Sequence, residues 1–224
     1  MRPFIAFIFF ALAVPLSAQP SPVVISELMW PGSTASTADE WIELYNSSDA
    51  TVDIAGWTLT YRSGSEDKVM LVLDAAEIPA GQTFLIANYA ADHKNSLLAV
   101  EPQRVDAAVS LPNTKLLLQL YDGDPQAGGQ LIDVADDGRG APFAGDSASK
   151  SSMVRIAFDQ PGDQPESWAT ATEQSGWDAG ASELGTPGSI PAHLLPEGGE
   201  APEPVLGTNI APMSWALVKE RLYP

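Results

Sequence analysis

The strongest constraint on this chain is a pair of strand patterns packed into one stretch, residues 39–64. In the first pattern, WIELY, Ile42 and Leu44 share one face and their neighbours share the other, which is the period of two expected of a β-strand. In the second, WTLTY, the large apolar residues take one face and two threonines take the other. Asn, Ser and Asp residues between the patterns supply turn chemistry, and Gly56 allows a bend just before the second pattern. The stretch therefore predicts two strands of a β-sheet protein.

Further strand patterns follow at short intervals, separated by Gly, Pro and Asp. They cover residues 69–73, 83–87, 105–111, 116–121, 131–134 and 153–158. A short stretch at 90–100 partly fits one face of a helix, so we expect a helical turn or two there. Short, evenly spaced strands favour a β-sandwich over an α/β fold.

Four motifs occur in a defined order: ISE at 25–27, EWIEL at 40–44, VDIAGW at 52–57 and TPG at 186–188. Together they resemble the lamin tail domain family, of the bacterial secreted type, over roughly residues 22–190. The resemblance implies an all-β, immunoglobulin-like β-sandwich. It also implies an interaction module, which in bacteria often accompanies extracellular or membrane-associated hydrolases and nucleases.

Composition divides the chain into four parts. Residues 1–18 combine one basic residue, an apolar core and small residues before a possible cut, which predicts a signal peptide. Residues 19–190 hold the predicted sandwich domain, and residues 191–212 are rich in Pro and Gly, as in a linker. Residues 213–224 form a short tail, either an amphipathic helix or a frayed end.

The apolar core of the signal is shorter than the roughly 20 residues that a membrane helix needs, so we expect no transmembrane span beyond it. The chain has no cysteine, and its stability must therefore come from its core. Cysteine-free export suits a bacterial envelope protein, so we expect a secreted or cell-envelope location. Whether the signal is cleaved or retained as an anchor stays open.

The charge balance restricts the partners. With 11 basic and 29 acidic residues the formal net charge is −18, which repels polyanions. Nucleic-acid binding relies on neutralising phosphates with Lys and Arg, so nucleic acid is not an expected partner unless divalent metal bridges the two.

Residues suited to catalysis are scarce. His93 and His193 are the two histidines, and both lie in polar surroundings or in the linker, where we expect exposure. A serine and a lysine at 147 and 150 have the S-x-x-K spacing, but neither S-D-N nor K-T-G accompanies them. Glu27 and Glu43 lie inside strand patterns, where we expect them to hydrogen-bond neighbouring strands or loops. The sequence predicts a protein that is not an enzyme.

Two kinds of residue are candidates for a site. Carboxylates gather with glycines in one loop-rich region, which offers hard oxygen ligands for Ca²⁺; the alternative is a solvated acidic loop. The candidate metal ligands are Asp122, Asp124, Asp133, Asp136 and Asp137. Trp30, beside a Pro-Gly pair, and Trp177, in a Gly-rich loop, are candidates for exposed contacts with a ligand.

The leading hypothesis is a non-catalytic, exported binding or structural module. It would recognise a protein or glycan partner through loops and sheet edges. The alternative is a metal-dependent hydrolase, or an accessory domain of a hydrolase or nuclease, that uses the acidic loops. The oligomeric state stays open.

Overall fold

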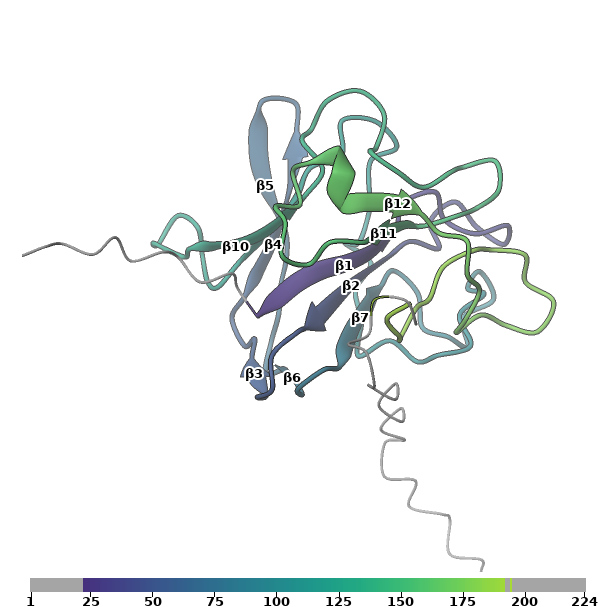
Figure 1. The fold of residues 1–224 in the computed structure, drawn as a ribbon, viewed down its shortest axis with the longest axis horizontal. Coiled ribbons are helices and arrows are strands. Elements are labelled where there is room, and N and C mark those ends of the chain that lie inside the picture. Colours follow the sequence, from purple (N-terminus) through teal and green to yellow (C-terminus); the bar gives the residue numbers. More distant parts are fainter. Residues whose placement is uncertain (1–21, 192–193, 195–224) are drawn as a thin grey trace, which may run out of the picture.

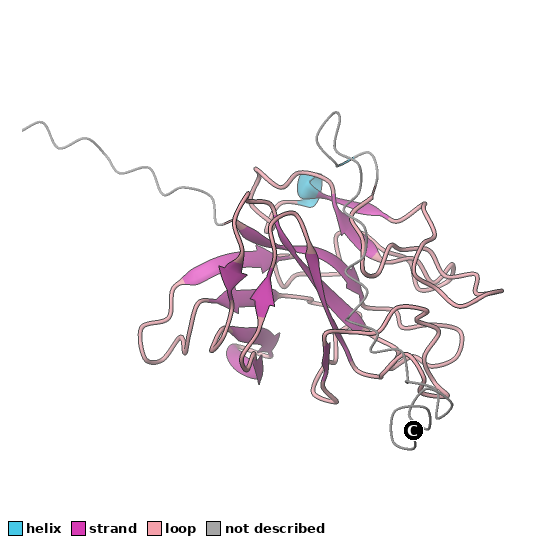
Figure 2. Cartoon of the chain, turned by 90° about the horizontal axis from the view of Figure 1, so that it is seen from below, coloured by secondary structure: helices cyan, strands magenta, loops and turns pink. Residues whose placement is uncertain are grey.

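The computed structural model describes residues 22–191 and residue 194 (Figure 1). Nearly all regular structure in this part of the chain is β. The strands are β1 Val23–Met29, β2 Trp41–Asn46, β3 Val52–Asp53, β4 Thr58–Ser63, β5 Glu66–Val72, β6 Glu77–Ile78, β7 Thr83–Ala87, β8 Arg104–Val105, β9 Leu118–Tyr121, β10 Leu131–Ala135, β11 Met153–Arg155 and β12 Trp168–Thr170. The helical element with described bounds is one short 3-10 helix, η1 Pro165–Ser167 (Figure 2).

The described strands form two main sheets that face each other. One has the order β12-β11-β1-β2-β7-β8, and the other has the order β10-β9-β4-β5. All neighbours pair antiparallel except β7 and β8, which are parallel. β3 and β6 form a small additional ladder. This is the all-β, immunoglobulin-like sandwich that the sequence predicts.

The predicted alternation in β2 and β4 is confirmed. Ile42 and Leu44 of β2 join Leu59 of β4 in the core between the two sheets. Gly56 has φ of 80°, so it makes the predicted bend before β4 in a conformation that favours glycine. The Asn46 side chain donates to the Ala50 carbonyl at 2.7 Å, which confirms the turn chemistry after β2.

Every residue of β1 and β2 is buried, because the six-stranded sheet is covered on both faces. Its inner face packs on the four-stranded sheet. Its outer face carries a second cluster, built on Trp41 and closed by residues from later loops such as Leu98 and Trp177. Alternate residues of β1 and β2 therefore do not divide between core and solvent. They divide between the core inside the sandwich and the second cluster on the outer face.

Two expectations about local structure are wrong. Of residues 105–111, only the first belongs to a strand, β8, while Val109 and Leu111 enter the core from irregular chain. Residues 90–100 form turns and no helix. Their apolar side chains pack on the second cluster from a loop. Their spacing in the sequence therefore resembles that of one helix face although no helix forms.

The predicted signal peptide at 1–18, nearly all of the predicted linker at 191–212, the tail at 213–224 and His193 lie outside the described residues. The predicted domain boundaries stay predictions. Among the described residues, no helix has the length and apolar content needed to cross a bilayer.

Candidate functional site

The motifs that resemble a family signature meet at a buried pair of glutamates. Glu27 of β1 and Glu43 of β2 are direct cross-strand partners, with 1% and 0% of their surface exposed. Residues 185–189, here called the closing segment, lie over them. The Thr186 amide and hydroxyl donate to the Glu27 carboxyl at 2.9 and 2.7 Å, and the Gly188 amide donates to Glu43 at 2.6 Å. The expectation that both glutamates bond neighbouring strands or loops is confirmed.

Burial dominates the electrostatics of this pair. Loss of water raises the pKa of Glu27 to about 7, against the hydrogen bonds from Ser152 and Thr186, which lower it. Burial, and next the Glu27 charge, raise the pKa of Glu43 well above its usual range. The pair therefore holds a proton near neutral pH. The pair is shielded from solvent and holds the closing segment through these hydrogen bonds.

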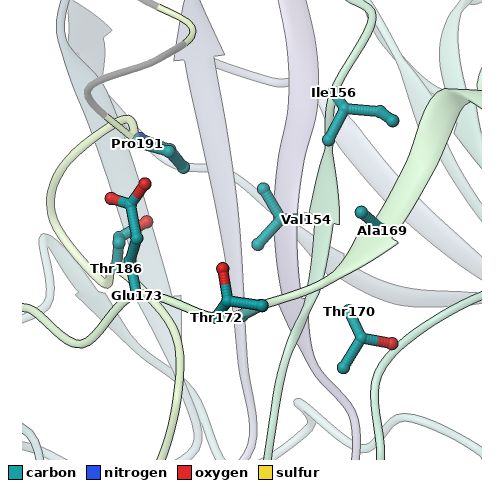
Figure 3. Close-up of a pocket in the computed structure, with 9 residues that line it drawn as sticks. Val154, Ile156, Ala169, Thr170, Thr172, Glu173, Thr186 and Pro191 are labelled. Carbon is teal, nitrogen blue, oxygen red and sulfur yellow. The ribbon is translucent and has the colours of Figure 1, made fainter.

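An apolar groove lies beside the closing segment, on the outer face of the six-stranded sheet (Figure 3). Its cavity volume is about 180 Å³. Its walls come from β11, β12, the chain after β12, the closing segment and the end of the described domain. The lining residues are Val154, Ile156, Ala169, Thr170, Ala171, Thr172, Glu173, Thr186 and Pro191.

The strand alternation of β11 builds one wall of the groove. Met153 points into the core, whereas Val154 and Ile156 face outward. Ile156 keeps 40% of its surface exposed, so part of this wall is open to solvent. Figure 3 shows Val154, Ile156 and Ala169 on one side of the groove.

The other wall is more polar. Thr186, Glu173 and Pro191 lie on this side, opposite the aliphatic wall (Figure 3). The lining carries one carboxylate, Glu173, and no basic side chain. The groove can therefore bury an aliphatic or aromatic side chain and favours a cationic group at its rim.

A buried ion pair holds β11 in place beneath the groove. Arg155, 1% exposed, contacts Asp133 of β10 at 3.2 Å and lies over the Trp168 ring, 5.0 Å from its centroid. Asp133 also accepts the Ile25 amide of β1 at 2.8 Å. Burial raises the Asp133 pKa, while the Arg155 charge lowers it. These contacts tie the two sheets together and fix β11, which carries Val154 and is followed directly by Ile156.

The structure does not bring the five aspartates predicted as calcium ligands together. Asp133 pairs with Arg155, and Asp136 is buried and accepts the Phe143 amide at 2.7 Å. Asp122 and Asp124 accept amides of their own loop, at Gln130 and Gln126. The fifth carboxylate bonds its own turn as well, since Asp137 accepts the Arg139 amide at 2.8 Å. In residues 22–191 and 194, no group of three or more acidic or histidine side chains is arranged to hold a metal. Four of these carboxylates accept amides within their own loops, and Asp133 binds Arg155 and the Ile25 amide.

The exposure predicted for Trp30 and Trp177 is wrong. They are 7% and 8% exposed. Trp30 Nε1 donates to the Ala144 carbonyl at 2.8 Å, and Trp177 Nε1 donates to the Gly185 carbonyl at 2.9 Å. Trp177 also packs on Trp41, with ring centroids 6.0 Å apart. Both rings are buried by loops that are distant in sequence, so neither offers a face to a ligand.

The groove is not among the sites that the sequence predicts. The signal that points to it is the pattern at 153–158, where Val154 and Ile156 alternate with Met153 and Arg155. An apolar pair on the side away from the core is visible in that pattern. What encloses it, β12 and the closing segment, comes from chain farther along.

A model of the lamin tail domain matches residues 17–138, more than half of the chain. The chain belongs to the lamin tail domain family. Lamin tail domains are immunoglobulin-like and typically non-enzymatic. The match covers β1 to β10; β11, β12 and the closing segment follow it, yet β11 pairs with β1 and Thr186 bonds Glu27. No curated protein matches the chain.

Proposed function

We propose that this chain is a non-catalytic, exported binding module that recognises a protein partner through the groove beside β11 and β12. The observation that carries the proposal is the apolar groove itself. It presents Ile156, 40% exposed, directly after β11, the strand next to the sheet edge formed by β12. Exposed apolar surface in a concave, well-supported position is typical of a binding site.

Several features support a binding role over catalysis. Lamin tail domains are typically non-enzymatic. The paired glutamates are sealed beneath the closing segment, and His93 stacks on Tyr89 with ring centroids 4.3 Å apart. The carboxylates of the acidic loops accept hydrogen bonds from amides of the same loops. No observation on the described residues therefore favours the hydrolase alternative.

The groove chemistry favours a protein over a glycan. Sugar recognition uses exposed aromatic faces, but none of the described residues that line the groove is aromatic. The groove offers aliphatic surface and a few threonine hydroxyls instead. Because the chain carries a net charge of −18, the best partner segment has apolar side chains flanked by Lys or Arg.

Residues 1–18 support the exported location, since their charge, apolar core and small residues have the order of a signal peptide. The module would then act at the cell surface or outside it. A segment of a surface protein that exposes apolar and basic residues has the chemistry to bind there.

The test selects 12-residue peptides displayed on phage against the full mature chain. We expect enrichment of peptides with aliphatic or aromatic residues next to Lys or Arg. Fluorescence anisotropy then gives the Kd of an enriched peptide. We expect Ile156→Asp to weaken binding at least about tenfold, because a charge enters the apolar wall.

Val105→Asp is the matched control. Val105 is 42% exposed and lies in β8, at the opposite edge of the same sheet. Its substitution should leave the Kd unchanged. Equal loss in both variants, or no enriched peptide that binds, would contradict the proposal. Glycan binding that Ile156→Asp abolishes, measured on a glycan array, would replace the protein partner with a glycan.

A further inference from the structure

The groove lies where the described domain ends. Pro191 lines it, and the chain continues from there into residues 195–224. Resting on the proposed function of this groove, we infer that its occupant in the absence of a partner is the chain's own segment 213–222. A partner peptide then binds by displacing this segment.

The segment has the chemistry that the groove selects. Its sequence, MSWALVKERL, carries Trp215, Leu217, Val218 and Leu222 beside two basic residues and one acidic residue, Glu220, so it is positively charged overall. Lys219 and Arg221 are two of only 11 basic residues in a chain with 29 acidic ones. The apolar side chains suit the wall at Ile156, and the positive charges suit the rim at Glu173.

The connection is long enough for the segment to return. Residues 195–212 add 18 residues between Leu194 and Met213, which extend to at most about 60 Å. The groove adjoins the start of this connection, so a short return path is sufficient. Tethering of this kind gives an effective concentration on the order of millimolar, so even a weak contact is well populated.

This arrangement regulates the proposed binding site. A partner with low affinity fails to displace the tethered segment, whereas a partner with more apolar or more basic residues succeeds. Removing the apolar side chains of the segment should therefore tighten peptide binding by the groove. Trp215→Ala combined with Leu222→Ala is the variant that tests this effect.

The absence of cysteine makes a direct test possible in the full chain. Thr172→Cys places a thiol at the groove while leaving its aliphatic wall intact, and Ser214→Cys places one beside Trp215. We expect this pair to form an intramolecular disulfide under mild oxidation. The expected rate is at least tenfold above that of a control pair, Thr51→Cys with Ser214→Cys. Thr51 is also exposed and lies in the loop before β3.

Equal rates in the two pairs, or a covalent dimer in place of the intramolecular product, would overturn the inference. Adding Ile156→Asp to the groove pair should lower its rate to that of the control; an unchanged rate would also overturn it. Failure of the proposed function has a different signature. If the cross-link fails but Ile156→Asp still abolishes peptide binding, only the self-occupancy is lost. If the cross-link forms but no peptide binds any variant, the partner function is lost.

Discussion

The two sides of the closing segment differ in almost every physical respect. One side is a sealed polar seat, in which Thr186 and Gly188 donate to Glu27 and Glu43. The other side is an open apolar groove, in which Ile156 and Val154 face outward. Thr186 belongs to both, since its hydroxyl bonds Glu27 and its side chain lines the groove.

The difference shows how a buried polar network can hold one wall of a groove in place. Fully satisfied buried polar groups specify one position for the segment that they hold. A groove wall fixed in this way requires no ordering when a ligand arrives. Changes in the seat should therefore lower stability strongly, whereas changes in the groove should lower affinity and leave stability nearly intact.

The largest expected effect is that of Glu27→Ala. It leaves the Ser152 hydroxyl and the Thr186 amide and hydroxyl without their acceptor and opens a cavity. We expect the free energy of unfolding at pH 5 to fall by about 4 kcal/mol. Urea unfolding followed by tryptophan fluorescence measures it. Thr172→Ala in the groove is the control. A loss below about 1 kcal/mol for Glu27→Ala would contradict a large contribution of the seat to stability.

Next in size is the pH dependence of stability. The Glu27 pKa is raised from 4.5 to about 7 in the folded state, so the folded state binds more protons in this window. Stability should be full below pH 4.5 and fall by about 3 kcal/mol as the pH rises through 7. Glu43 and Glu40, whose pKa values burial also raises, act in the same direction. Urea titrations at pH 5 and pH 8 measure the fall, and Glu27→Gln should reduce it. A protein more stable at pH 8 would contradict this electrostatic description.

A smaller effect is expected for Gly185→Ala. The new Cβ would lie 2.7 Å from Glu27 Oε1 and 2.8 Å from Ser152 Oγ, so the seat must shift. We expect this shift to lower the free energy of unfolding by about 2 kcal/mol. Gly180→Ala is the matched control, because Gly180 also has positive φ but its Cβ would meet nothing within 4 Å. Thermal unfolding of both variants compares them. If Gly180→Ala is equally destabilising, backbone conformation alone explains the loss.

The smallest expected effect concerns the acidic loops. Asp124→Asn should change the free energy of unfolding by less than about 0.5 kcal/mol, because the loop carboxylate bonds an exposed amide. Calorimetric titration with Ca²⁺ at millimolar concentration should release no heat. Heat that disappears in Asp124→Asn would restore the calcium site that the sequence predicts.

The sequence predicts strands well where local pattern decides the outcome. Ile42, Leu44 and Leu59 occupy the faces that their spacing predicts, and Gly56 bends the chain as its missing side chain allows. Glu27 and Glu43 also bond as expected, because carboxylates inside strand patterns need partners when they are buried.

The rest depends on contacts between distant parts of the chain. Trp30 is covered by a carbonyl 114 residues away, and Asp133 is neutralised by Arg155 across the two sheets. No local pattern contains those partners. The groove was equally hidden, since it requires β11, β12 and the closing segment to be placed side by side.

We propose that the buried polar seat carries stability and the groove carries binding. Ile156→Asp tests it most directly when both quantities are measured on the same protein. We predict a Kd for the selected peptide at least about tenfold weaker than in the unmodified chain, with the free energy of unfolding within about 0.5 kcal/mol. An unchanged Kd, or a loss of affinity matched by a loss of stability, would contradict this separation of roles.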